Sequence, residues 1–178
     1  MVIARQQMTL KQFLRLPEEE PALEYWHGEV TQKVAPKLPH GALQSSIVER
    51  VSQAAGPGRP FRAFTETRIT FAGVSTVPDL VVYRRERIPR DAHGNLADDT
   101  TVPPDVAVEI LSPGQSRTQL LARCRWYVSH GVRLAIFADP RRRVVRLLRP
   151  GAESPDRRAS GMGSLLDALD RELLRAGT

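Results

Sequence analysis

The segment from Asp105 to Ser112 restricts the fold of this chain more than any other. It reads Asp-Val-Ala-Val-Glu-Ile-Leu-Ser, and Glu109 is the one charged residue inside an otherwise apolar run. A short continuous apolar run is typical of a strand that is buried on both faces in the middle of a sheet. The chain is therefore expected to form a sheet with helices on both sides.

Helical patterns occur on both sides of this run. Apolar residues recur with the spacing of one helix face in His40–Ala54 and in Ser116–His130, where Gly131 follows as a terminator. A capping box of Thr9 and Gln12 predicts a further short helix near the N-terminus. These segments supply the helices that a buried sheet requires.

The remaining segments are interpreted as strands and loops. Leu23–Val34 predicts a hairpin that reverses at His27-Gly28. Two adjacent strands are predicted at Phe61–Phe71 and Thr76–Tyr83, with later strands at Leu134–Ala138 and Val144–Leu148. Loops are expected at 84–104 and 151–163, and a last helix at 164–173.

The order of these elements predicts the fold class. After residue 40 the chain runs helix, three strands, helix, strand and a further strand, which favours an α/β fold with a mixed central sheet flanked by helices. An N-terminal helix and a short hairpin precede this core. With 178 residues, we expect a single domain over 1–178, with its core at about 8–149 and a loop and C-terminal helix at 150–178.

The sequence lacks the features of a membrane or exported protein. No segment approaches the roughly 20 consecutive apolar residues that a membrane helix needs, and the N-terminus has no basic segment followed by an apolar run. Cys124 is the only cysteine, so the chain can form no internal disulfide. These features predict a cytoplasmic protein without a membrane partner.

Arginine dominates the charge of the chain. The formal net charge is +6, from 26 basic and 20 acidic residues. The basic residues gather in clusters at Arg84, Arg85, Arg87 and Arg90, at Arg141, Arg142, Arg143, Arg146 and Arg149, and at Arg157 and Arg158. Such clusters suit a polyanion such as nucleic acid, although a solvated basic surface is an equal alternative.

Two carboxylates are embedded in predicted strands. Glu109 interrupts the apolar run described above, and Asp79 lies between Val77-Pro78 and Leu80-Val81-Val82. A buried carboxylate needs a compensating partner. Two such groups on neighbouring strands can share Mg²⁺ or Mn²⁺, with the backbone carbonyl of Ile110 as a third oxygen ligand. Pairing of each acid with an arginine is the alternative.

Several motifs resemble one known family. The segments Val77–Val82, Pro104–Pro113, Tyr127–Val132 and Phe137–Pro140 are similar to those of the Uma-two family of predicted endonucleases, which have the restriction-endonuclease-like PD-(D/E)XK fold. Upstream, Glu24–Val30 with Gly28 resembles a family motif, and His40 falls where the family has a histidine that opens a helix. The resemblance covers about residues 8 to 149.

The resemblance implies an αβββαβ core and metal-dependent hydrolysis of phosphodiester bonds, with DNA as the favoured nucleic acid. Asp79 would match the aspartate of the motif and Glu109 its second acid. The motif's lysine position is occupied by Leu111, and the lysine that the family carries on the following helix matches Arg123. Glu24 and His40 are further candidates, as an additional acid and a general base.

Two other functions remain open on the sequence alone. The chain can be a weak or inactive nuclease-fold protein that binds nucleic acid or a protein partner, since both acids are present but the lysine is replaced. It can also be a structural oligomeric module whose embedded acids are paired with basic side chains. Small nucleases commonly dimerise to cut two strands, so a homodimer is compatible with the sequence.

Overall fold

The computed structural model describes residues 8–55, 58, 60–155 and 157–158. Within this part of the chain the helices are α1 (Leu10–Phe13), α2 (Leu38–Ala54), the 3-10 helix η1 (Arg85–Arg87) and α3 (Arg117–Ser129). The strands are β1 (Leu23–Trp26), β2 (Glu29–Gln32), β3 (Phe61–Thr65), β4 (Ile69–Phe71), β5 (Val74–Thr76), β6 (Leu80–Arg84), β7 (Val106–Ile110), β8 (Leu134–Asp139), β9 (Val144–Arg149), β10 (Ala152–Glu153) and β11 (Arg157–Arg158). None of the described helices has the length and apolarity to cross a membrane.

The main sheet has the strand order β10-β9-β8-β7-β6-β3, and β11 also pairs with β9. Strands β7 and β8 are parallel, whereas the other neighbours are antiparallel. Because β4 and β5 belong to another sheet, the elements of the core follow one another as α2, β3, β6, β7, α3 and β8. This is the predicted αβββαβ order in a mixed sheet.

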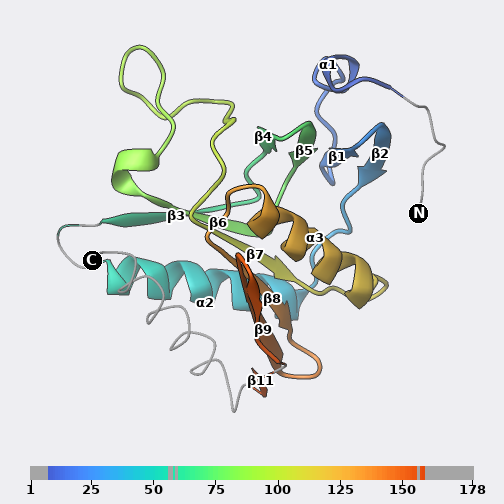
Figure 1. Cartoon of the computed structure of the whole chain (residues 1–178), viewed down its shortest axis with the longest axis vertical. Helices are drawn as coiled ribbons and strands as arrows, with labels where there is room; N and C mark the ends of the chain where they lie inside the picture. Colours follow the sequence, from blue (N-terminus) through green and yellow to red (C-terminus); the bar gives the residue numbers. More distant parts are fainter. Residues whose placement is uncertain (1–7, 56–57, 59, 156, 159–178) are drawn as a thin grey trace.

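Helices α2 and α3 cover opposite faces of this sheet (Figure 1). Alternate side chains of a strand point to opposite faces, so β7 contributes Val108 to the cluster with α2 and Ala107 to the cluster with α3. All five residues of β7 are buried, as its apolar run predicts. Glu109 therefore lies in the interior, on the same face as Ala107 and α3.

A smaller sheet with the order β2-β1-β5-β4 lies beside the main one (Figure 1). Its hairpin reverses at His27 and Gly28, which both have the positive φ values of a tight two-residue turn. The Thr9–Gln12 capping box is also present at the start of α1, whose Phe13 packs on Tyr25. The predicted hairpin and first helix are thus confirmed.

The region between residues 61 and 84 differs from the prediction. The predicted strand Phe61–Phe71 is divided into β3 and β4, which pair with β6 and β5 in two different sheets. Glu66 adopts a left-handed φ of 48°, which interrupts the strand between them. Pro78 lacks an amide donor for a sheet ladder. Asp79 consequently lies in a bend directly before β6, and the prediction of Asp79 within a strand was wrong.

The C-terminal part is described only as far as residue 158. The predicted loop at 151–163 contains two short strands, β10 and β11, which extend the edge of the main sheet at β9. A loop prediction therefore missed this edge pairing. The predicted helix at 164–173 lies outside the described residues.

Candidate metal centre

Asp79 accepts hydrogen bonds on both carboxylate oxygens at the start of β6. Its Oδ2 accepts the amide of Ile110 at 2.7 Å, and its Oδ1 accepts the ammonium of Lys33 at 2.8 Å. The Nε2 atom of His40 lies 3.5 Å from the same Oδ1. Burial alone would raise the pKa of Asp79, but His40 and Lys33 outweigh it and lower that pKa. Asp79 is therefore held as a carboxylate.

Lys33 brings a buried cation to this point. The residue follows β2, and its amide donates to the carbonyl of Ala22, which continues the hairpin pairing. Its Nζ contacts Glu66 Oε2 at 2.6 Å as well as Asp79, and only 9% of its side chain is exposed. Burial would lower the pKa of Lys33, but Asp79, Glu109 and Glu66 more than compensate and raise it. The ammonium stays charged.

Lys33, His40, Glu66 and Asp79 form what we call the Lys33 cluster. Gln44 of α2 supports it by donating to Glu66 Oε1 at 3.0 Å and to the backbone carbonyl of Asp79. One ligand atom from each of His40, Glu66 and Asp79 lies within 4.8 Å of the other two. A divalent ion can use a set of one imidazole and two carboxylates. These three side chains are therefore a candidate metal site.

His40 is oriented toward this site from the first turn of α2. Its Nδ1 is hydrogen-bonded to Ser112 Oγ at 2.9 Å, which fixes the ring. Its Nε2 faces Asp79, is buried and makes no hydrogen bond. Buried polar atoms nearly always have a partner, and a ring nitrogen fixed through its other nitrogen is typical of metal-binding histidines. The donor set thus fits a metal ion.

A second group lies under α3, and we call Glu24, Glu109, Arg123 and Tyr127 the Arg123 cluster. The guanidinium of Arg123 donates to both oxygens of Glu24 at 2.9 and 2.7 Å and lies 3.6 Å from Glu109 Oε1. Tyr127 donates its hydroxyl to Glu109 at 2.6 Å. Trp26 of β1 stacks under the guanidinium at 4.9 Å. The two hydrogen bonds to Glu24 and the contact with the Trp26 ring thus fix the orientation of the Arg123 guanidinium.

The carboxyl group of Glu109 has a pKa well above its ordinary value. Burial raises its pKa to about 7, and the carboxylates of Asp79 and Glu24 add to the effect, whereas Arg123 and Lys33 oppose it. Burial and the Glu109 charge also raise the pKa of Tyr127, so its phenol stays protonated and donates a hydrogen bond to Glu109. Glu109 is therefore poised to hold a proton near neutral pH.

The charges of the two clusters do not balance. Together they contain four carboxylates, from Glu24, Glu66, Asp79 and Glu109, against the two permanent cations of Lys33 and Arg123. Three of these acids are almost fully buried. Pairing with basic residues, the alternative interpretation, thus accounts for two of the three buried carboxylates. Glu66 is exposed, so the buried acids exceed the two cations by one negative charge when Glu109 is ionised, and a bound cation would offset that charge.

The structure brings most of the predicted site residues together. In the antiparallel register Leu80 pairs with Val108, so Asp79, directly before β6, comes next to Glu109 of β7. Glu24 and Arg123 pair with each other, and His40 lies beside Asp79. Ile110 contacts Asp79 through its amide. A ligand role for the Ile110 carbonyl stays a prediction.

Two residues of the Lys33 cluster were missed by the sequence interpretation. Glu66 lies within the predicted strand Phe61–Phe71, where nothing in the sequence distinguishes it as a site residue. Lys33 had one signal that was not used: the chain contains 23 arginines and only three lysines, at positions 11, 33 and 37. In a chain that uses arginine so consistently, a lysine beside the family-like hairpin motif indicates a position where a compact ammonium is required.

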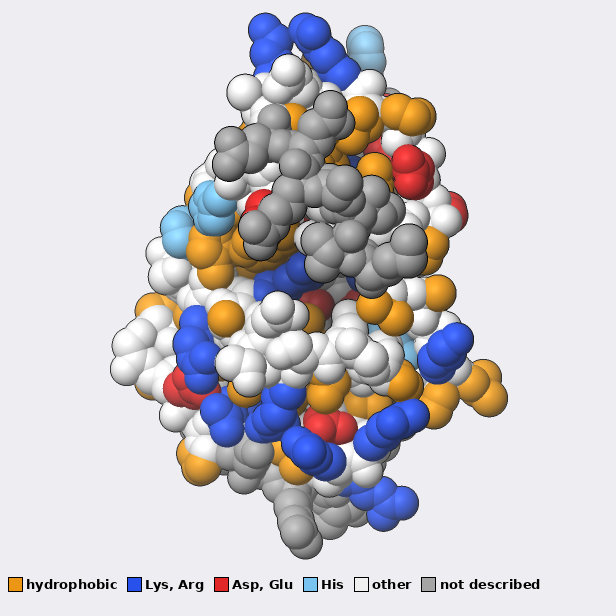
Figure 2. Space-filling model, turned by 90° about the vertical axis from the view of Figure 1, so that its right-hand side faces the viewer, with side chains coloured by type: hydrophobic (Ala, Val, Ile, Leu, Met, Phe, Trp, Pro, Cys, Tyr) orange, Lys and Arg blue, Asp and Glu red, His pale blue; other side chains and the backbone are white. Residues whose placement is uncertain are grey.

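The arginine clusters are partly neutralised within the protein. Arg84 and Arg87 are paired with the buried Asp105, and Arg146 with Glu153. Figure 2 shows Lys and Arg side chains gathered over one part of the surface, with acidic side chains between them. The basic surface is therefore weaker than the count of arginines suggests.

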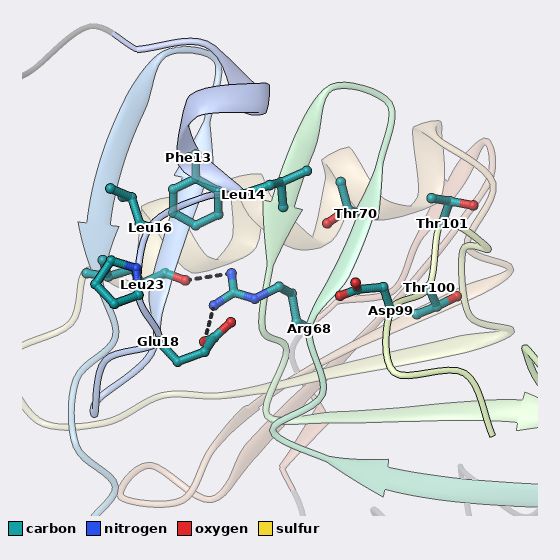
Figure 3. Close-up of a pocket in the computed structure, with 11 residues that line it drawn as sticks. Phe13, Leu14, Leu16, Glu18, Leu23, Arg68, Thr70, Asp99, Thr100 and Thr101 are labelled. Carbon is teal, nitrogen blue, oxygen red and sulfur yellow. Dashed lines mark hydrogen bonds and ion pairs between the residues drawn. The ribbon is translucent and has the colours of Figure 1, made fainter. Parts of the chain in front are cut away.

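A separate pocket lies between α1, β1 and the segment around Thr100 (Figure 3). Its cavity measures about 240 Å³. The guanidinium of Arg68 lies within it, but donates to Glu18 and to the carbonyl of Leu23 (Figure 3). No residue of the two clusters lines this pocket. This pocket is therefore separate from the Lys33 and Arg123 clusters.

The fold and these clusters define an α/β protein of the restriction-endonuclease-like class. A family model, Uma2, described as "Putative restriction endonuclease", matches residues 10–173. The chain therefore belongs to the Uma2 family, the Uma-two family that its motifs resemble.

Solved structures agree with this assignment. A protein from Anabaena variabilis ATCC 29413, whose crystal structure at 1.96 Å is described as that of "a putative nuclease belonging to DUF820", is 39% identical, with a TM-score of 0.81 over 85% of each chain. A cryo-EM structure of a DrdV–DNA complex has a TM-score of 0.45 and 18% identity over 74% of this chain and 11% of that chain. Similarity at that level assigns no function. No curated protein matches the chain.

Proposed function

We propose that this protein is a metal-dependent endonuclease that hydrolyses phosphodiester bonds of DNA at Asp79 and Glu109. The observation that carries the proposal is three buried carboxylates against the two cations of Lys33 and Arg123, an excess of one buried negative charge when Glu109 is ionised. Such an excess is costly unless a cation or protons compensate it. Membership of a nuclease family supports the same conclusion.

Each side chain has a role that its contacts support. Asp79 and Glu109 would hold Mg²⁺ or Mn²⁺, with His40 and Glu66 within reach of Asp79. When bound, such an ion polarises a phosphoryl oxygen and lowers the pKa of water. Arg123 provides a fixed positive charge that can stabilise the charge developing on the phosphate. Because arginine stays protonated, it cannot also transfer a proton.

Cleavage of DNA in the presence of Mn²⁺ tests this proposal. The protein is expected to cut single- or double-stranded DNA with Mn²⁺ and to stop when EDTA is added, because the acids alone cannot activate water. Glu109→Gln should reduce the rate by at least about a hundredfold. If metal and EDTA make no difference, or if Glu109→Gln cuts at the parental rate, the proposal is wrong. A protein that cuts no DNA with or without metal would fit the weak or inactive nuclease-fold alternative.

Arg123→Lys is a second, finer prediction. Lysine cannot reproduce the two-pronged contact with Glu24 and the stacking on Trp26, so we expect the cleavage rate to fall by about tenfold or more. Arg125→Lys, two residues further along α3, is the matched control, since Arg125 pairs with Glu153 away from the centre. If Arg123→Lys cleaves DNA faster than the parent, Arg123 has replaced a lysine and performs its role less well.

A further inference from the structure

The Lys33 ammonium occupies the region that a metal ion would need. Its Nζ is hydrogen-bonded to Asp79 Oδ1 and Glu66 Oε2. These side chains are two of the three that could hold an ion, and the third, His40, points a buried nitrogen without a hydrogen-bond partner at Asp79. Lys33 thus satisfies two of the candidate ligands, while the Nε2 atom of the third lies 3.5 Å from Asp79 Oδ1 without a hydrogen bond.

Resting on the proposed metal-dependent function, we propose that a divalent ion binds to His40, Glu66 and Asp79 by displacing the Lys33 ammonium. The same site then holds the Lys33 ammonium in the metal-free protein and a divalent ion in the metal-bound protein. We call it an exchange site. This adds His40 and Glu66 to Asp79 and Glu109 as proposed ligands and gives Lys33 a regulatory role.

Simultaneous occupation by both cations is unfavourable. Divalent ions of this kind bind carboxylate oxygens at about 2.1 Å. An ammonium that remains hydrogen-bonded to the same two oxygens would lie within a few ångströms of the ion, where like charges repel strongly in a buried environment. One of the two cations must therefore leave.

The lysine side chain can move without disturbing the fold. The backbone of Lys33 is held by the hydrogen bond from its amide to Ala22, next to the paired strands β1 and β2. The charge itself sits at the end of a flexible four-carbon stem. Rotation of this stem releases Asp79 and Glu66 while the hairpin stays paired. The exchange therefore requires a side-chain movement alone.

The ligand set also predicts which ion is preferred. Mg²⁺ favours oxygen ligands and retains its waters, whereas Mn²⁺ and later transition ions bind imidazole more readily. With His40 as a ligand, the protein should bind Mn²⁺ at least about tenfold more tightly than Mg²⁺. His40→Ala should weaken Mn²⁺ binding by a similar factor and Mg²⁺ binding much less.

Acetylation of lysine side chains in the unmodified protein tests the exchange. The chain offers Lys11 and Lys37, both exposed, as internal references for the buried Lys33. Mass spectrometry should show slow acetylation of Lys33 without metal and at least about fivefold faster acetylation with saturating Mn²⁺, because the released amine becomes accessible. The reference lysines should not change. If bound Mn²⁺ leaves Lys33 as protected as before, the exchange is refuted.

Calorimetry of Mn²⁺ binding provides the second test. Lys33→Met should lower the dissociation constant at least about tenfold, because the competing charge is removed, while the matched Lys37→Met variant should bind like the parent. Equal binding by both variants would overturn the proposal. Failure of the proposed function is distinguishable: tighter Mn²⁺ binding without DNA cleavage refutes only the nuclease activity, whereas Mn²⁺-dependent cleavage with a protected Lys33 refutes only the exchange.

Discussion

Asp79→Asn is expected to abolish metal-dependent cleavage, with a loss of at least about a thousandfold. Asparagine has the size of aspartate and retains an oxygen that can accept the Ile110 amide, so the bend before β6 should persist. It lacks the charge that attracts a divalent ion and that now pairs with Lys33. Cleavage rates and Mn²⁺ binding should therefore be lost together.

Asp105→Asn is the matched control for that experiment. Asp105 is also almost fully buried and also binds arginine and a backbone amide, but it precedes β7 at the end opposite Glu109. Its substitution should cost stability and leave the cleavage rate per folded molecule unchanged. If Asp79→Asn were to lose no more activity than Asp105→Asn, Asp79 would be a structural acid and the proposed centre would be wrong.

Local patterns in the sequence were sufficient to predict most of the fold. The apolar run of β7, the helical stripes of α2 and α3, and the turn at His27-Gly28 each depend on a few consecutive residues. Burial, helix periodicity and turn geometry act over that same short range. These elements were therefore predicted with nearly correct boundaries.

The division of residues 61–84 between two sheets could not be predicted in this way. Alternation of side chains shows that a segment is extended, but it does not show which partner strand it pairs with. Here the left-handed Glu66 follows β3, and Pro78 lies between β5 and β6. Glu66 and Pro78 thus lie where the chain leaves the main sheet after β3 and returns to it before β6.

The candidate centre was predicted only in part for a related reason. Asp79 and Glu109 were recognisable because a charge in an apolar segment is anomalous by itself. Lys33 is separated from Asp79 by 46 residues and is important only because the fold brings them together. Glu66 likewise becomes notable only through its contact with Lys33. Contacts of this range require the structure.

The stability of the metal-free protein should decrease as pH rises, because of Glu109. Its pKa is raised by burial from 4.5 to about 7 in the folded protein. Between these values the folded state retains a proton that the unfolded state has released, so unfolding becomes easier as pH increases. Below pH 4.5 both states are protonated and this penalty is absent. From pH 4.5 to above 7 the free energy of unfolding should fall by about 3 kcal/mol.

Urea unfolding at pH 5, 6, 7 and 8 measures this decrease, with Glu109→Gln as the control. Glutamine cannot ionise, so the variant should lose most of the slope while it keeps a polar partner for the Tyr127 hydroxyl. Mn²⁺ should restore stability above pH 7, because a divalent ion favours the ionised carboxylate. A parent protein that is equally stable at pH 5 and pH 8 without metal would mean that Glu109 is already neutralised by Arg123. The buried negative charge that supports a metal centre would then be too small to require an ion.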